Sequence, residues 1–202
     1  MKYVLTILLL MALSTSALAQ SKVTQITYNM SIPDGDMTDY IEETSFRGIG
    51  LDGRWFLQGG DSPLALGLST AWHVFNQTES GTVVLPNGAL TGYQNRYLNT
   101  FPIMATAAFY FGSKDRLWLY LGVGVGTYYT IQRFEIGVIA LEETNWHFGG
   151  YPEIGIHFPL EEMDITINGR YNVAFESGED ITKDSAQWTY WGINVGLAYR
   201  GW

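Results

Sequence analysis

The segment 117–131 alternates between two kinds of side chain along its whole length. Its odd-numbered positions are mainly Leu and Val, and its even-numbered positions are Trp, Tyr, Thr and Gly. Neighbouring side chains of a β-strand point to opposite faces, so this segment has one apolar face and one small or polar face. At about 3.3 Å per residue such a strand extends about 50 Å, enough to cross a bilayer at a tilt of about 40°. The segment therefore predicts a strand with lipid on one side and a packed lumen on the other.

The same alternation recurs in seven further segments. They span residues 24–32, 46–57, 64–74, 97–111, 146–158, 165–175 and 188–200. With the first segment this makes eight strands, an even number that suits a closed antiparallel sheet. We therefore predict an all-β fold, namely an eight-stranded antiparallel up-and-down transmembrane β-barrel.

The N-terminus predicts export. Lys2 precedes a short apolar stretch, and Ala17-Leu18-Ala19 supplies the small residues of a cleavage site before Gln20. We expect residues 1–19 to be a signal peptide and residues 20–202 to form a single barrel domain. No later run of 18 apolar residues predicts a helical anchor. The chain has no cysteine, which excludes both disulfides and a lipid anchor on Cys.

The connections alternate in length. The segments between predicted strands are long at 33–45, 75–96, 132–145 and 176–187, and short at 58–63, 112–116 and 159–164. Outer-membrane barrels have long extracellular loops and short periplasmic turns. We therefore expect four extracellular loops, with both termini in the periplasm.

Aromatic residues on the predicted outer face lie at the two ends of the strands. Those toward the short turns are Trp55, Phe109, Phe111, Phe158 and Tyr199, and those toward the long loops are Trp72, Tyr97, Phe101, Tyr129, Trp146, Phe175 and Trp191. Two aromatic girdles at the membrane interfaces produce this distribution. The core of a soluble β-protein would not sort its aromatic residues by strand end.

Four charged residues fall on the predicted inner face, namely Asp52, Arg54, Glu153 and Arg170. Charges in a narrow lumen must be paired to offset their desolvation, and eight strands leave a lumen that side chains just fill. We interpret the four residues as a structural plug. A hydrolase would instead need a nucleophile, a histidine and a carboxylate that converge. Ser69 and His73 share one strand, about 13 Å apart, so we expect no catalytic residue here. Asp34-Gly35-Asp36 is too short for a calcium-binding loop, so we expect no metal.

Two prolines interrupt the predicted ladders. Pro102 and Pro152 lie inside strands of a barrel without edges, where each removes a hydrogen bond. Gly149-Gly150 stands just before Pro152 and predicts a β-bulge. Such a bulge would reverse the facing of Trp146, His147 and Phe148.

Four motifs carry a resemblance to a known family. They are Phe-Arg-Gly-Ile-Gly-Leu-Asp-Gly-Arg-Trp-Phe-Leu at 46–57, Leu-Ala-Leu-Gly-Leu-Ser at 64–69, Leu-Tyr-Leu-Gly-Val-Gly-Val-Gly at 119–126 and Pro-Glu-Ile-Gly-Ile at 152–156. The mature chain resembles the small eight-stranded outer-membrane β-barrels, typified by the barrel domain of OmpA-like proteins, without the periplasmic domain of longer relatives. This resemblance implies insertion in the outer membrane of a Gram-negative cell envelope, with no cofactor and no common catalytic residues. Trp202 departs from the family's C-terminal assembly signal, because it is one position out of phase with Tyr199.

The sequence favours a structural, adhesive or envelope-integrity role for a monomeric barrel. The alternatives are a barrel enzyme acting on lipid or peptide and a narrow channel for small solutes. A secreted lipocalin-type barrel, suggested by a bare G-x-W motif at 53–55, is less favoured because Leu and Val would face water. The net charge is −9 and most acidic residues lie in the predicted loops, which excludes nucleic acid as a partner. The expected partners are outer-membrane lipids and lipopolysaccharide, with an unidentified loop ligand as a further candidate.

Overall fold

A computed structural model describes residues 21–57, 62–85, 88–161, 163–175 and 187–201. The predicted signal peptide, Trp202 and residues 176–186 of the last predicted loop lie outside these residues. Within the described part of the chain, no helix is long and apolar enough to span a membrane.

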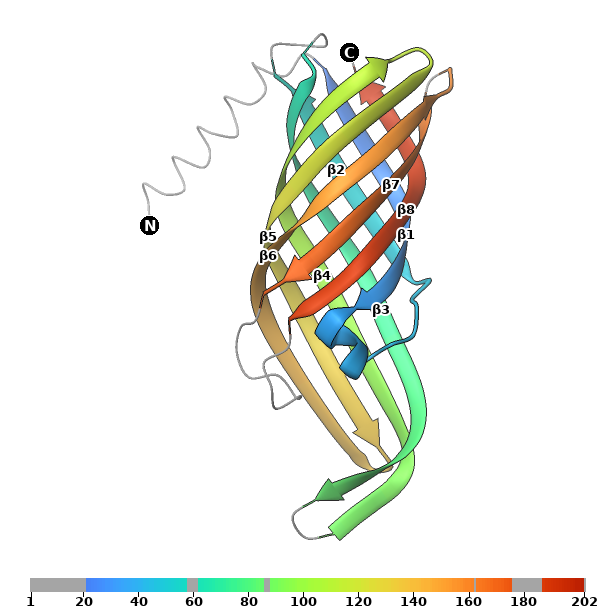
Figure 1. Cartoon of the computed structure of the whole chain (residues 1–202), viewed down its shortest axis with the longest axis vertical. Coiled ribbons are helices and arrows are strands. Elements are labelled where there is room, and N and C mark those ends of the chain that lie inside the picture. Colours follow the sequence, from blue (N-terminus) through green and yellow to red (C-terminus); the bar gives the residue numbers. More distant parts are fainter. Residues whose placement is uncertain (1–20, 58–61, 86–87, 162, 176–186, 202) are drawn as a thin grey trace, which may run out of the picture.

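Eight antiparallel strands form a closed barrel (Figure 1). The strands are β1 (Lys22–Asp34), β2 (Gly48–Phe56), β3 (Leu64–Leu85), β4 (Gly88–Ser113), β5 (Leu117–Ile136), β6 (Ile139–Pro159), β7 (Met163–Ala174) and β8 (Trp188–Gly201). Each strand pairs with its neighbours in sequence, and β8 pairs with β1 to close the ring. The predicted fold class is confirmed.

The predicted facing of the side chains is also correct. In β5, Leu121, Val123 and Val125 are more than half exposed on the outer wall, whereas Trp118 and Tyr120 are buried in the lumen. The same two-residue alternation runs through β1, β2, β7 and β8. The barrel therefore has an apolar outer wall and a mixed polar and aromatic interior.

Two of the predicted long loops are instead extensions of strands. β3 and β4 continue through most of residues 75–96, and β5 and β6 through most of 132–145, so that four strands project beyond the barrel (Figure 1). The prediction was wrong because it required apolar residues on the outer face. Outside a bilayer a strand does not need them, and these extensions continue the alternation with polar side chains such as Thr78 and Asn95, which bond across the strands.

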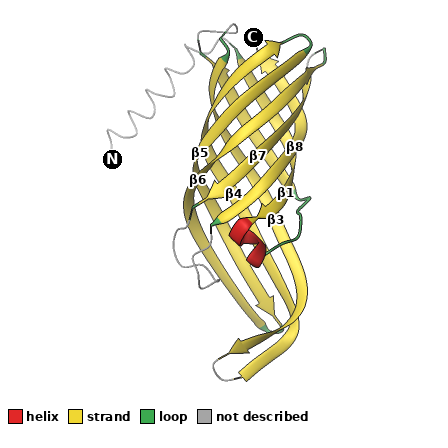
Figure 2. Ribbon diagram, in the orientation of Figure 1, coloured by secondary structure: helices red, strands yellow, loops and turns green. Residues whose placement is uncertain are grey.

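The remaining loop with described residues, 33–45, folds back onto the barrel. It begins as the end of β1 and continues into a short 3₁₀ helix, η1 (Gly35–Asp39), shown in red in Figure 2. Lys22 pairs with Gly201, so the two described ends of the chain lie together at the end with the short turns, opposite the extensions.

The two prolines interrupt hydrogen bonding without changing the register. The pairing of β3 with β4 stops at Ile103 and resumes at Thr100 with the same offset, and the pairing of β6 with β7 is likewise interrupted beside Pro152. The predicted bulge at Gly149-Gly150 is absent from these described strands, because the offset of β6 against β5 stays constant through both residues. A Cβ atom on Gly149 would stand 2.1 Å from a backbone oxygen of β7, so this glycine permits close approach of two strands instead of adding a residue.

Candidate functional site

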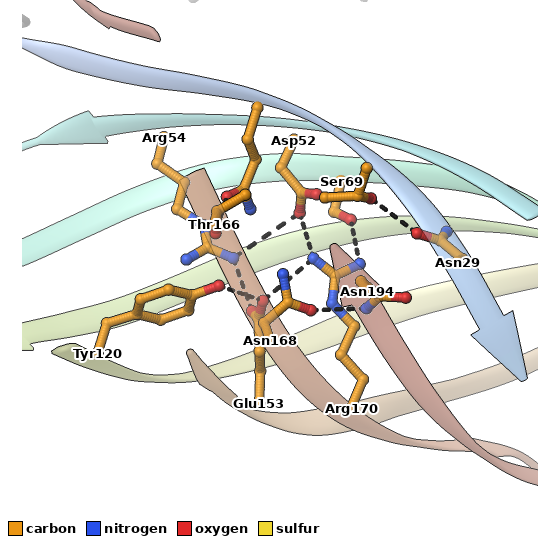
Figure 3. A network of polar contacts seen from close by, with 12 residues as sticks. Asn29, Asp52, Arg54, Ser69, Tyr120, Glu153, Thr166, Asn168, Arg170 and Asn194 are labelled. Carbon is orange, nitrogen blue, oxygen red and sulfur yellow. Dashed lines mark hydrogen bonds and ion pairs between the residues drawn. The ribbon is translucent and has the colours of Figure 1, made fainter. Parts of the chain in front are cut away.

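The centre of the lumen contains a closed ring of four charged side chains (Figure 3). Arg54 Nη2 lies 2.6 Å from Glu153 Oε2, and Arg170 Nη2 lies 2.6 Å from Asp52 Oδ1. Two longer contacts complete the ring: Arg170 to Glu153 at 3.2 Å and Arg54 to Asp52 at 3.8 Å. All four residues are at most 5% exposed. The structure thus brings together the four charges that the sequence placed on the inner face.

Neighbouring side chains hold this charge ring in place. The Tyr120 hydroxyl donates to Glu153 at 2.8 Å, and Arg54 donates to the Tyr110 hydroxyl at 3.1 Å. The Arg54 guanidinium also lies over the Tyr120 ring, 4.4 Å from its centre, and that of Arg170 lies 4.7 Å from the centre of the Tyr151 ring. These aromatic faces stabilise the cations where water is excluded.

The strand register explains why the ring forms. Glu153 of β6 and Arg170 of β7 are direct cross-strand partners, and Asp52 and Arg54 occupy successive inward positions of β2. A Cβ atom on Gly122 of β5 would stand 3.2 Å from a Glu153 carboxylate oxygen. Glycine at this inward position therefore leaves room for the carboxylate.

An apolar layer closes the lumen between the charge ring and the strand extensions. The segment 35–45, which we call the β1–β2 lid, places Met37, Tyr40 and Ile41 in this layer with at most 4% exposure. The other members of the layer are Phe75, Leu98, Met104, Tyr128, Tyr151, Ala174, Trp188 and Tyr190. Sequence analysis missed the lid, although apolar residues at 37, 40 and 41 of an otherwise polar loop have the spacing of one helical turn.

Hydrogen bonds fix the lid to the strand extensions. The Tyr40 hydroxyl donates to the Arg133 carbonyl at 3.0 Å, and the Arg96 guanidinium donates to the Tyr40 carbonyl at 3.0 Å. The Glu42 amide donates to the Gln77 side chain at 2.7 Å. Burial raises the pKa of Tyr40 to about 12, so the hydroxyl remains a donor in alkaline solution where an exposed tyrosine would already ionise.

A second apolar layer closes the lumen toward the short turns. Its members are Val23, Phe56, Ala65, Ala108, Tyr110, Trp118, Tyr120 and Ala198. The Tyr110 and Trp118 ring centres lie 4.4 Å apart, and Phe56 stacks on Trp118 at 5.3 Å. The charge ring is therefore enclosed between two aromatic layers.

The histidines of the lumen do not form a catalytic triad. His73 contacts Ser31, not Ser69, with 2.9 Å between Nδ1 and the serine oxygen, and both residues are buried. Among the described residues, His157 is the one histidine with a carboxylate within 4 Å, from Asp164 at 3.6 Å, and no group of His, Asp and Glu forms a metal site.

The predicted girdle residues lie on the outer wall near both ends of the strands. Trp55, Phe111, Phe158 and Tyr199 are exposed toward the short turns, and Trp72, Phe175 and Trp191 toward the extensions, where Tyr129 is half-buried between neighbouring rings. Around the extensions the rings form contacts from strand to strand, from Trp72 through Phe101 and Tyr129 to Trp146, at 6.1, 6.0 and 4.9 Å.

An antiparallel ring of eight strands with an apolar outer wall and a filled lumen is the fold of the small eight-stranded outer-membrane β-barrels. No family model and no curated protein matches the sequence. Among solved structures, the chain is similar to Neisserial surface protein A, with 11% identity over 90% of this chain and 95% of that one and a TM-score of 0.53. It is also similar to the outer membrane protein OprG from Pseudomonas aeruginosa, with 14% identity over 91% and 96% and a TM-score of 0.53. At these identities the likeness is one of fold.

Proposed function

We propose that this protein is an integral outer-membrane barrel with a closed lumen and a structural or adhesive role at the cell surface. The observation that carries the proposal is the filling of the lumen by three successive layers, two apolar and one ionic, with the lid as part of one apolar layer. Such an interior leaves little space for a solute or substrate. The surfaces that remain available to partners are the outer wall and the strand extensions.

The apolar outer wall and its aromatic ends support the membrane placement. We expect the extensions to be extracellular and the short turns periplasmic. Val138 lies fully exposed in the turn between β5 and β6, and Ser113 lies exposed at the short-turn end of β4. On intact cells a membrane-impermeant thiol reagent should therefore label Val138→Cys and should leave Ser113→Cys unlabelled.

Two controls accompany this labelling. Both variants should label after the cells are lysed, and unboiled samples should migrate differently from boiled ones in SDS gels, as folded barrels do. Labelling of Ser113→Cys alone on intact cells would invert the proposed topology. Recovery of the protein as a soluble periplasmic monomer would overturn the membrane placement.

The closed lumen predicts very low conductance. In planar bilayers we expect the parent protein to give no steady channel, because each layer alone obstructs the path. Glu153→Gln weakens only the ionic layer, so we expect brief flickering openings at most. Bilayers treated with detergent alone provide the baseline. Large steady channels in the parent protein would contradict a closed lumen and favour the alternative of a small-solute channel.

We propose further that the barrel performs no catalysis. The Ser31–His73 contact is the nearest approach to a nucleophilic pair, but both residues are buried and no described carboxylate lies within 4 Å of His73 to orient it. The partners that this role implies are outer-membrane lipids and lipopolysaccharide around a monomeric barrel. Hydrolysis of lipid or peptide substrates by the purified protein would overturn this assignment.

A further inference from the structure

The projecting part of β3 and β4 has an outer face with an unusual composition. The strand alternation places on it Asn76, Thr78, Ser80, Thr82, Thr91, Tyr93, Asn95 and Tyr97, which we call the β3–β4 outer face. It contains amides, hydroxyls and two tyrosine rings, without a charged or aliphatic residue. The buried Gln77, Gln94 and Leu98 lie on the opposite face of the same strands.

This face is both exposed and internally ordered. Tyr93 is 74% exposed, the largest exposed fraction of any aromatic residue among those described. Thr78 donates to the Asn95 side chain at 2.9 Å, and the Thr82 and Thr91 hydroxyls lie 2.8 Å apart. These cross-strand bonds hold the polar side chains in a row, so little side-chain entropy remains to be lost on binding.

The electrostatics of the extensions disfavour an anionic ligand. Arg133, the direct partner of Tyr97 on β5, makes ion pairs with both Glu135 and Glu142. Arg96 on the opposite face is bonded to the Tyr40 carbonyl, to Gln94 and to Glu79. Both cations are therefore already engaged, and the β3–β4 outer face itself is neutral.

The composition fits an uncharged saccharide. A pyranose has a face of C–H bonds, which packs on an aromatic ring, and an edge of hydroxyls, which an amide or hydroxyl row can bind as both donor and acceptor. Tyr93 and Tyr97 lie four residues apart on one strand, about 13 Å. Two rings at that spacing, with Asn95 between them, suit a chain of several sugars.

We propose that the β3–β4 outer face binds the neutral saccharide chain of a glycolipid in the surrounding membrane. This inference depends on the proposed membrane placement, because the face begins at Asn76 and Tyr97, the second outward-facing pair beyond the position of Trp72 and Phe101 in the aromatic girdle. The saccharide part of an outer-leaflet glycolipid stands at that height. The occupant is therefore a sugar chain already close to the barrel.

The test uses the full protein in phosphatidylcholine nanodiscs. Mild acid and anion exchange separate lipopolysaccharide of the source strain into a neutral saccharide fraction, a charged inner-core fraction and lipid A. These three fractions and heparin are the probes, and the neutral fraction is the saccharide that we expect to bind. Saturation-transfer NMR and titration should detect binding of the released saccharide, with transfer to its C–H protons. We expect Tyr93→Ala to weaken this binding about tenfold or more, and Tyr93→Trp to retain it. Raising the salt from low to high should leave the affinity unchanged, because no ion pair contributes.

Val138→Ala is the control, since Val138 is fully exposed in the turn that joins the β5 and β6 extensions and lies outside the face. It should bind as the parent does. The proposal is overturned if the parent does not bind the saccharide, if a Tyr93→Ala, Tyr97→Ala double variant binds it unchanged, or if binding needs lipid A or heparin instead. The two proposals can fail separately. If thiol labelling places the protein outside the outer membrane but saccharide binding still depends on Tyr93, the binding site stands and the proposed function is wrong.

Discussion

Replacing Glu153 with glutamine should destabilise the folded barrel by about 3 to 5 kcal/mol. The substitution removes the carboxylate that faces both Arg54 at 2.6 Å and Arg170 at 3.2 Å, and leaves two buried guanidinium groups with Asp52 as their remaining carboxylate. A buried charge that loses its partner costs far more than an exposed one. Urea titration of the protein in lipid vesicles, followed by tryptophan fluorescence, measures the change in unfolding free energy.

Glu142→Gln is the matched control. Glu142 also pairs with an arginine, Arg133, but the two groups lie 3.9 Å apart and are about half exposed. An exposed pair of this kind contributes about 0 to 1 kcal/mol. Equal losses in the two variants would show that the lumen does not isolate its charges from water.

Double variants distinguish the two arginines around Glu153. Adding Arg54→Met to Glu153→Gln leaves Arg170 and Asp52 as a neutral pair at 2.6 Å, whereas adding Arg170→Met leaves Arg54 facing Asp52 at 3.8 Å. We therefore expect the Arg54 double variant to recover more of the lost stability. If neither double variant recovers stability, the charge ring contributes through packing and not through charge.

Alternation in the sequence was sufficient to predict that these four charges face the lumen, but it did not predict which of them pair. An odd or even position along a strand determines the face on which a side chain lies. It does not determine the height of that side chain along the barrel axis. Height depends on the stagger between strands, which the chain sets through registers such as Glu153 with Arg170 and Asp52 with Ser69. The contact of Arg54 with Glu153 joins residues on opposite sides of the barrel. No local pattern in the sequence could therefore predict it.

The lid and the extensions were missed for a different reason. The sequence reading equated a strand with an apolar outer face, which holds only where lipid is the solvent. In the proposed membrane placement the solvent beyond the girdle is water, where strands with Thr78 or Asn95 on the outer face are stable. The lid has the opposite character, because its Met37 and Ile41 leave water to fill the mouth of the barrel.

Glycines account for another part of what the pattern left open. The sequence pattern predicts small residues on the inner face at Gly67, Gly126 and Gly196. In the folded barrel, a Cβ atom at each of these positions would come within 2.2 Å of a neighbouring backbone oxygen. A small barrel curves sharply, so its strands approach more closely on the inside. The composition gives the number of glycines. The structure of the barrel is needed to identify the positions at which its curvature requires glycine.

Gly196→Ala should therefore impair closure of the barrel. A Cβ atom there would lie 1.9 Å from the Ile26 carbonyl oxygen and 2.7 Å from the Thr27 Cα, both in the backbone of β1. Backbone cannot move aside as a flexible side chain can, and this seam joins the first and last strands. We expect a loss of about 3 kcal/mol or more, at the upper end of overpacking costs, and a lower yield of the heat-modifiable form in refolding assays.

Gly169→Ala is the control that isolates this effect. Gly169 lies in the wall of the same barrel, on β7, but a Cβ atom there would meet Ile154 at 3.9 Å, an ordinary contact. Its stability should stay within about 0.5 kcal/mol of the parent, or rise slightly because alanine restricts the unfolded chain. If both variants lose stability equally, loss of glycine flexibility explains the result. A loss confined to Gly196→Ala means that β1 and β8 close only because no side chain stands between them.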